Sequence, residues 1–261
     1  MSFEKIKNPA MSEKIIGKVA KTLDAAIEND PINGMADFHS ELLDKFQINI
    51  DLLAEKRESF VSDREKLNTE PGLVIANHPS AIDASVILEN IRRKDLKIIM
   101  KQEMVDFAQK FPHLKDNFLP ASKDPKVAVQ TMKLAIEHID NGGLVMIFPT
   151  AGKDRNGNNA EFRSGFRFLL SKMRPTDMVY AFNIDIKDNT HIESRLNTNM
   201  NFITTVLSGV TVPFSGFDDV TNISLDEKYT SAEDWQKVCE PNISSKAKNS
   251  NLTTKYKSLF K

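Results

Sequence analysis

The sequence has little cysteine, and neither charge is in excess. Its 261 residues include a single cysteine, Cys239, which excludes an internal disulfide framework and a cluster of cysteine metal ligands. Lysine and arginine total 35 against 36 aspartate and glutamate, so the formal net charge is −1. A chain so nearly neutral has no global attraction to nucleic acid, and any basic site must be local.

Long hydrophobic runs are also missing. The longest apolar stretches, such as 72–76 and 144–148, have the length of a strand and fall far short of the roughly 18 residues of a membrane span. The first residues, MSFEKIKNPAMSEK, carry charge where a signal peptide has its apolar core. We therefore expect a cytoplasmic protein, and peripheral contact with the inner membrane surface remains open.

The first 66 residues have helical periodicity. Apolar residues recur every four positions at Ile15, Val19, Leu23 and Ile27. A second helix is expected around 38–46, and the apolar residues of 52–61 suggest a third. We interpret residues 1–66 as a small helical N-terminal subdomain.

After a turn signal at 69–72, short apolar runs alternate with helical patterns. Strands are expected at 73–76, 96–100, 118–119, 144–148, 178–186 and 202–212. Helices are expected at 81–92, 104–111, 128–139 and 162–170, and the third of these ends at glycines that can adopt a left-handed cap. The alternation predicts an α/β domain over residues 67–261, with a mostly parallel central sheet flanked by helices. In such sheets, sites gather at the carboxyl ends of the strands.

A histidine and an aspartate follow the first of these strands. The segment 77–83 reads Asn-His-Pro-Ser-Ala-Ile-Asp, so that His78 leaves a strand, passes a proline turn and precedes Asp83 in the first turn of a helix. Such a bend brings the carboxylate to the imidazole and fixes its tautomer, as a general base requires. The alternative is a helix-capping turn with a histidine that only packs.

A second loop combines small residues with cations. The segment 148–155 reads Phe-Pro-Thr-Ala-Gly-Lys-Asp-Arg and ends the strand at 144–148. Small residues such as Thr150 and Gly152 admit a ligand to the backbone, and Lys153 and Arg155 can bind a phosphate monoester. The alternative is a hydrophilic surface hairpin. Lys123, in the loop after 118–119, is on its own an ordinary solvated lysine.

The order of these blocks resembles the glycerolipid acyltransferase family, the glycerol-3-phosphate and lysophosphatidate acyltransferases. The resemblance covers about residues 70–215, and the 149–155 segment is most similar to the soluble plastid-type glycerol-3-phosphate acyltransferases, which have Pro-Ser-Gly-Gly-Arg-Asp-Arg there. It implies that His78 is the general base and that Asp83 orients it. It further implies phosphate binding by Lys123, Lys153 and Arg155, next to a substrate-binding loop at Thr150 and Gly152.

The chain departs from the family pattern at three places. The membrane-bound branch has Phe-Pro-Glu-Gly-Thr-Arg, whereas Thr150 begins the small residues here and no glutamate is present. The plastid type has Ser-Lys-Lys-His where Lys123 is followed by Asp124. Lys153 replaces an arginine, which keeps the charge but loses the bidentate geometry.

The resemblance implies an enzyme, a glycerol-3-phosphate 1-O-acyltransferase of phospholipid biosynthesis. The acyl donor is a thioester of acyl carrier protein or coenzyme A, and the reaction needs no metal or other cofactor. The alternatives are 1-acylglycerol 3-phosphate as the acceptor, or a catalytically silent lipid-binding relative. Hydrolase chemistry is disfavoured because the sequence has no Gly-x-Ser-x-Gly elbow.

Two basic segments are candidate contact surfaces. The stretch 92–94 with Lys97 and Lys101 can be interpreted as a docking site for the acidic donor or as a solvated helix end followed by a strand. The last 20 residues carry five lysines and no acid. They form either a solvated basic tail or a contact for an acidic partner or anionic lipid headgroups.

Overall fold

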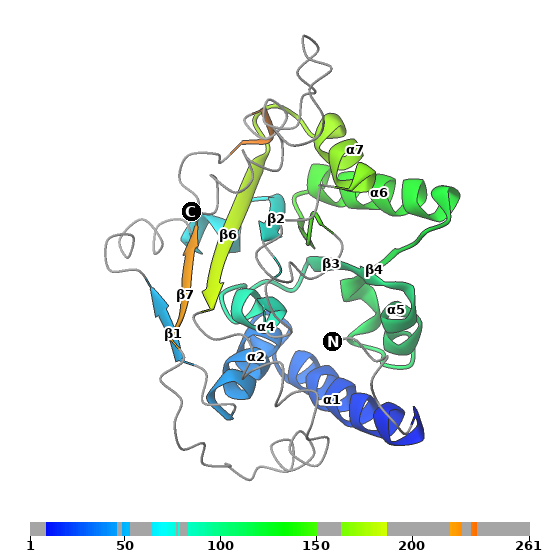
Figure 1. Ribbon diagram of the computed structural model, residues 1–261, viewed down its shortest axis with the longest axis vertical. Coiled ribbons are helices and arrows are strands. Elements are labelled where there is room, and N and C mark those ends of the chain that lie inside the picture. The colour runs from blue at the N-terminus through cyan, green and yellow to red at the C-terminus, as the bar shows by residue number, and fades with distance from the viewer. Residues whose placement is uncertain are drawn as a thin grey trace.

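A seven-stranded sheet organises the protein (Figure 1). The computed structural model describes residues 9–45, 49–52, 64–76, 78, 83–150, 163–186, 220–225 and 231–233. The strands are β1 (Asn49–Leu52), β2 (Gly72–Ala76), β3 (Leu96–Lys101), β4 (Phe118–Ala121), β5 (Leu144–Ile147), β6 (Met178–Ile186) and β7 (Val220–Leu225). Their order across the sheet is β1-β7-β6-β2-β5-β3-β4.

Five neighbouring strands run parallel, from β6 through β2, β5 and β3 to β4. β7 pairs antiparallel with β6 and carries β1 on its other side. The sheet is therefore mostly parallel, which confirms the predicted α/β class. All five parallel strands end at one edge, and the sequence motifs at 77–83 and 148–155 both begin there.

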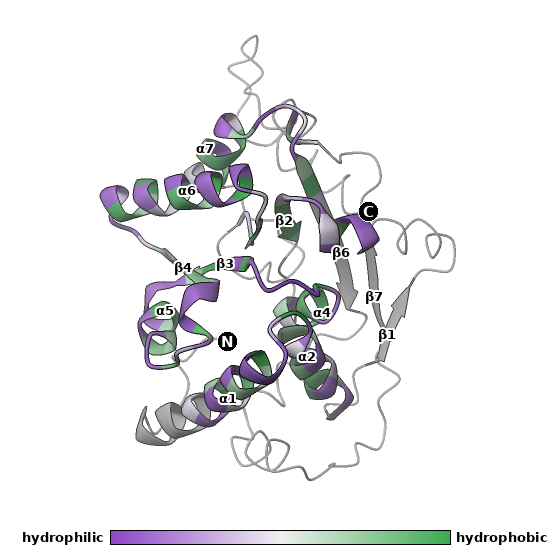
Figure 2. Ribbon diagram, turned by 180° about the vertical axis from the view of Figure 1, so that it is seen from behind, coloured by the Kyte–Doolittle hydropathy of each residue, from purple (hydrophilic) through white to green (hydrophobic). Residues whose placement is uncertain are grey.

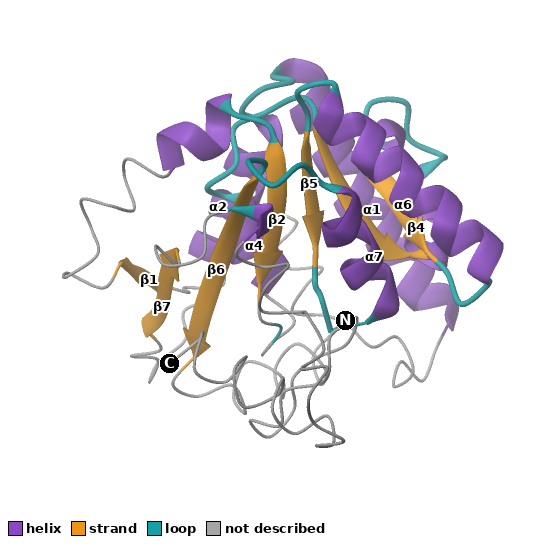
Figure 3. Ribbon diagram, turned by 90° about the horizontal axis from the view of Figure 1, so that it is seen from above, coloured by secondary structure: helices purple, strands orange, loops and turns teal. Residues whose placement is uncertain are grey.

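Helices cover both faces of the sheet, as Figures 1 and 3 show. The helices are α1 (Pro9–Asn29), α2 (Gly34–Lys45), α4 (Asp83–Leu88), α5 (Gln102–Ala108), α6 (Pro125–Asp140) and α7 (Ser164–Lys172). Buried residues of α1, α2, α4 and α5 share one apolar cluster with the sheet, and those of α6 and α7 share a second. The sheet is thus the middle of three layers.

The strands β2 and β5 are buried on both faces, because successive side chains point in opposite directions. Val74 and Met146 pack in the cluster with α1, α2 and α4, whereas Leu73 and Val145 pack in the cluster with α6 and α7. This accounts for their continuous apolar sequence. Each helix needs only one apolar stripe, and Figure 2 shows α1, α2, α6 and α7 with green and purple faces.

Local signals define the two ends of α6. The Asp124 side chain accepts a hydrogen bond from the Lys126 backbone N–H at 2.8 Å, and proline occupies the first helical position. At the other end, Gly142 has a φ of 91°, and the Gly143 N–H donates to the His138 carbonyl. This is the left-handed glycine cap that the sequence predicted.

Two boundary predictions were wrong. Leu52, expected to belong to a third helix, instead ends strand β1, because β1 pairs with β7, which lies about 170 positions later in the chain. The helix expected over 81–92 ends at Leu88, because the Asn90 side chain donates to the Val86 carbonyl at 2.9 Å in the turn that follows. The strand expected at 202–212 lies outside the described residues.

The domain boundary at residue 66 stays a prediction. Within the described residues, Leu23 and Ile27 of α1 and Phe38 of α2 belong to the same apolar cluster as Val74 of β2. The two N-terminal helices therefore share a core with the sheet. A subdomain at 1–66 would have to be defined by chain order rather than by a separate core.

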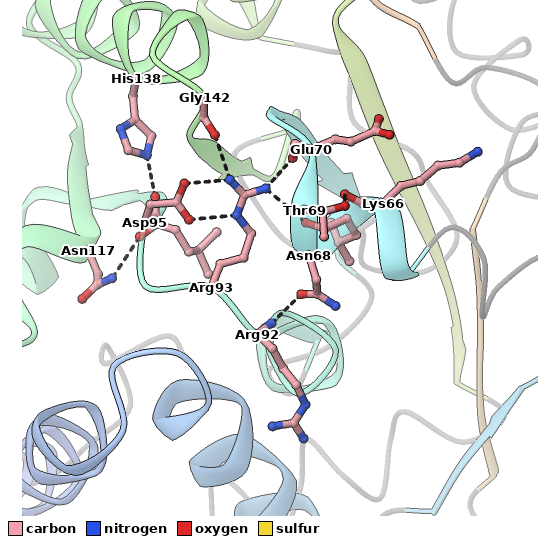
Figure 4. A network of polar contacts seen from close by, with 12 residues as sticks. Lys66, Asn68, Thr69, Glu70, Arg92, Arg93, Asp95, Asn117, His138 and Gly142 are labelled. Carbon is pink, nitrogen blue, oxygen red and sulfur yellow. Dashed lines mark hydrogen bonds and ion pairs between the residues drawn. The ribbon is translucent and has the colours of Figure 1, made fainter.

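An arginine network closes the amino edge of the sheet (Figure 4). The Arg93 side chain is only 7% exposed, and its Nε and Nη2 bond the two carboxylate oxygens of Asp95 at 2.8 and 2.7 Å. Its other bonds go to the backbone carbonyls of Gly142, at 2.8 Å, of Leu67, at 3.4 Å, and of Glu70. Arg93 thus joins the segments that precede β2, β3 and β5.

The contacts of Arg92 and Arg93 show what these two residues of the basic stretch at 92–94 bind. Arg93 is occupied inside the protein, and Arg92 pairs with Asp37 at 2.7 Å. Burial acts to raise the pKa of Asp95, but the hydrogen bonds and charge of Arg93 outweigh it and lower that pKa below its ordinary value. For Arg93, both expectations were wrong, since it is neither a docking residue nor a solvated helix end.

We expect Arg93→Met to lower the free energy of unfolding by about 2–3 kcal/mol, because it leaves the backbone carbonyls and the Asp95 carboxylate, whose side chain is 33% exposed, without their donor. Arg92→Met is the matched control, because Arg92 and Asp37 are 35% and 61% exposed and such pairs contribute less than about 1 kcal/mol. Urea unfolding of both variants measures the difference. Equal losses would show that the network contributes no more than a surface ion pair.

Candidate functional site

The candidate site lies where β2 and β5 end side by side. Gly72 pairs with Leu144 and Ile75 with Ile147 in a continuous parallel register. Continuing the register beyond the strands brings His78 opposite the turn at 148–150. Two motifs separated by about 70 residues in the sequence therefore meet at the carboxyl edge of the sheet.

His78 and Asp83 form a hydrogen-bonded pair. The Nδ1 of His78 lies 2.7 Å from the Oδ2 of Asp83, which is the first residue of α4. The Asp83 side chain is fully buried, whereas the His78 side chain is 21% exposed. The predicted approach of the carboxylate to the imidazole is present, and His78 does more than pack. Its catalytic role stays a prediction.

The pairing has a chemical consequence for the imidazole. An ionised carboxylate accepts hydrogen bonds and cannot donate them, so Nδ1 must carry the proton in the neutral ring. Nε2 then carries a lone pair, as a general base requires. A buried carboxylate also stabilises the imidazolium that forms when Nε2 takes up a proton.

Phe148 is a further member of the site. The sequence predicted only that this residue ends a strand. Its ring stacks on the His78 ring with centroids 4.3 Å apart and planes 21° from parallel. It is partly buried and packs against the cluster that also contains α4 residues. The sequence signal was the Phe-Pro pair before the small residues, but only the register of β2 and β5 shows which side chain it meets.

Arg163 holds the turn that follows Phe148. Its Nε donates to the Thr150 carbonyl at 3.1 Å, and its backbone N–H donates to the Pro149 carbonyl at 3.0 Å. Thr150 is fully buried at this point. The structure therefore fixes Thr150 in the turn that directly follows Phe148, and its assignment to a substrate-binding loop stays a prediction.

The other predicted site residues lie farther from His78 or fall outside the described residues. Lys123 is exposed beyond the end of β4, and β5 and β3 lie between β4 and β2. Three strand spacings of roughly 4.8 Å separate the two strands by about 14 Å. Asp124, which replaces a family cation, caps α6 instead. Gly152, Lys153 and Arg155 lie outside the described residues.

The helix that carries Asp83 is supported by α2. His39 of α2 lies with its Nδ1 3.1 Å from the Ser85 Oγ of α4. Its ring meets that of Phe38 edge-on at 5.2 Å. Burial lowers the pKa of His39 to about 4, so the ring is neutral at physiological pH.

The described residues contain neither a group of side chains that could hold a metal ion nor a helix that could span a membrane. In that part of the chain, no three His, Cys, Asp or Glu side chains gather in a way that could hold a metal ion. None of the described helices is long and apolar enough to cross a membrane. The expectation that the reaction needs no cofactor stays a prediction.

Comparison with known proteins gives one family. Residues 58–184 match the family model described as Acyltransferase. This match supports an acyltransferase-family domain. The matched segment contains β2 to β5, His78 and Asp83, and the turn at 148–150, and the match supports acyl transfer. The plastid-type subgroup stays a prediction.

One solved structure is similar at low identity. It is the crystal structure of the 1-acyl-sn-glycerophosphate (LPA) acyltransferase PlsC from Thermotoga maritima, with a TM-score of 0.42 and 14% sequence identity, over 89% of this chain and 78% of that chain. No curated protein matches the sequence.

The tautomer of His78 can be tested without any substrate. We expect ¹⁵N NMR of the ring at pH 8 to show a proton on Nδ1, because the Asp83 carboxylate can only accept. Asp83→Asn should redistribute the proton between the two nitrogens, since an amide can either donate or accept. A wild-type ring protonated on Nε2 would contradict the assignment of His78 as a base.

The shifted pKa of His39 makes stability pH-dependent. The folded-state pKa of about 4 is below the unfolded value near 6.5, so the unfolded chain gains a proton first as the pH falls. Stability from this residue is complete above pH 6.5 and is lost between 6.5 and 4, by about 1–3 kcal/mol. Urea unfolding across this range should show that loss in the wild type relative to His39→Gln. Parallel pH profiles would show that His39 titrates normally.

Proposed function

We propose that this protein transfers a fatty acyl group from a thioester donor to the sn-1 hydroxyl of glycerol 3-phosphate. The observation that carries the proposal is the His78–Asp83 pair at the carboxyl edge of the sheet, within the segment that matches the acyltransferase family. A thioester is already activated, so the catalyst needs a base and an anion-binding surface.

His78 acts twice in the reaction. Its Nε2 first takes the proton of the acceptor hydroxyl as that oxygen attacks the thioester carbonyl, which forms the C–O bond of a tetrahedral intermediate. The intermediate then collapses, the C–S bond breaks, and the imidazolium returns the proton to the departing thiolate. The products are the ester and the free thiol. Asp83 keeps the ring oriented and stabilises its charged form in between.

The acceptor phosphate is assigned to the loop that follows β5. Thr150 follows Phe148, whose ring stacks on His78, by two residues, and Gly152, Lys153 and Arg155 come within the next five residues of the chain. Lys123 is a weaker candidate, because two strands separate β4 from β2. Lys and Arg form charge-assisted bonds with phosphate, and the small residues let it approach the backbone.

The donor is acyl carrier protein or coenzyme A, and the basic stretch at 92–97 does not distinguish them. Arg92 and Arg93 bond within the protein, and the Lys97 ammonium donates to the Asp116 carbonyl at 2.9 Å. That stretch precedes or begins β3, at the edge opposite His78. Lys101, by contrast, is the last residue of β3 and is exposed at the carboxyl edge.

We place the reaction in the cytoplasm, at or near the inner membrane surface.

The test is acyl transfer by the purified protein from both thioesters to glycerol 3-phosphate and to 1-acylglycerol 3-phosphate. We expect product with glycerol 3-phosphate and a fall in kcat of roughly 10²–10⁴-fold in His78→Ala, since a general base contributes that much. His113→Ala is the matched control, because His113 is 40% exposed and pairs only with Glu28 on the surface among the described residues. Circular dichroism checks that both variants fold.

Each outcome decides a different part of the proposal. Product only with 1-acylglycerol 3-phosphate keeps the chemistry and changes the acceptor. Equal activity of His78→Ala and wild type removes His78 from the mechanism. Absence of product from every pair, with a folded protein, favours a catalytically silent lipid-binding relative.

A further inference from the structure

The hydrogen bond from Nδ1 to Asp83 orients the His78 ring within its own plane. A proton transfer needs Nε2 within hydrogen-bond distance of the acceptor hydroxyl, in a constant direction. A second contact, on the face of the ring, adds a restraint on tilting out of that plane.

Phe148 supplies that second contact. Its ring lies nearly parallel to the imidazole, with centroids 4.3 Å apart, so the flat faces meet across an area that an edge contact would not cover. Asp83 acts in the plane of the imidazole and Phe148 acts across it. Together they define both the position and the plane of the ring.

The backbone that carries the Phe148 ring is fixed before and after this residue. Phe148 directly follows β5, and β5 is paired with β2 on one side and β3 on the other. Beyond it, Arg163 bonds the carbonyls of Pro149 and Thr150 and so fixes the turn. Because its backbone is fixed in this way, the Phe148 ring can restrict the motion of the His78 ring against which it stacks.

We propose that Phe148 is a positioning residue for the His78 base, and that Arg163 supports it through the turn at 149–150. The proposal rests on the proposed acyl transfer, since it assigns the stack a role in kcat. Phe148 touches His78 rather than the reacting atoms. Its loss should slow the proton transfer without weakening the binding of either substrate.

The test compares Phe148→Met with Phe148→Tyr. Methionine keeps the apolar volume and removes the flat ring, whereas tyrosine keeps the ring. We expect Phe148→Met to lower kcat about 10- to 100-fold with both KM values within about threefold, because small misplacements of a reacting group have effects of this size. Tyrosine should restore most of kcat. Phe118→Met is the matched control, another partly buried phenylalanine packed against the same cluster at the opposite edge of the sheet.

An NMR readout separates this proposal from the proposed function. The stacked ring should shift the His78 ring protons upfield, and Phe148→Met should abolish that shift while Phe118→Met keeps it. If Phe148→Met does not fold, Arg163→Gln leaves the ring in place and should lower kcat by a smaller factor, with KM unchanged.

Three results would overturn the proposal. One is a loss of the ring shift in Phe148→Met without a change in kcat. Another is an equal fall of kcat in Phe118→Met, which would mark the effect as general packing. The third is a wild-type protein without the ring shift. A wild type with the ring shift but without acyl transfer to any acceptor would instead contradict the proposed function.

Discussion

The candidate site depends on the parallel register of β2 and β5. These strands pair residue for residue from Gly72 and Leu144 onward, so they end together and their following turns emerge side by side. Because side chains alternate along a strand, a shift of one residue would move Phe148 to the other face of the sheet. The stack on His78 requires the register that is observed.

The register is maintained by the core and by the opposite edge of the sheet. Leu73, Ile75, Val145 and Ile147 are buried toward α6 and α7. At the amino edge, Arg93 bonds carbonyls just before β2 and just before β5, so the two strands start at a fixed offset. The arginine is too far from His78 to take part in chemistry, but it acts on the site through the strands.

Much of this architecture could be predicted from the sequence. The apolar runs gave β2, β3, β5 and β6 nearly residue for residue, because strands buried on both faces have a continuous hydrophobic signature. The proline turn between His78 and Asp83 indicated their approach, because that contact is local in the chain. The glycine cap at Gly142 was predictable for the same reason.

The features that were missed are those that depend on distant partners. The alternation of polar and apolar residues at 49–52, Asn-Ile-Asp-Leu, fits a strand, but its partner β7 lies about 170 positions away in the chain. Arg93 looks like part of a basic surface until the carbonyls of Glu70 and Gly142 are placed around it. Phe148 belongs to the site only through the register. Sequence patterns report burial and local turns, whereas such contacts arise from the pairing order of the sheet.

The two turns at the carboxyl edge also suggest how acceptor binding and catalysis are linked. Asp83 approaches His78 from the β2 turn, whereas Phe148 approaches it from the β5 turn, which continues directly through Thr150 to Lys153 and Arg155. If those cations hold the acceptor phosphate, the bound acceptor and the stacked ring share one short stretch of backbone that Arg163 fixes. The same rigid turn would place the acceptor hydroxyl and orient the imidazole that takes its proton.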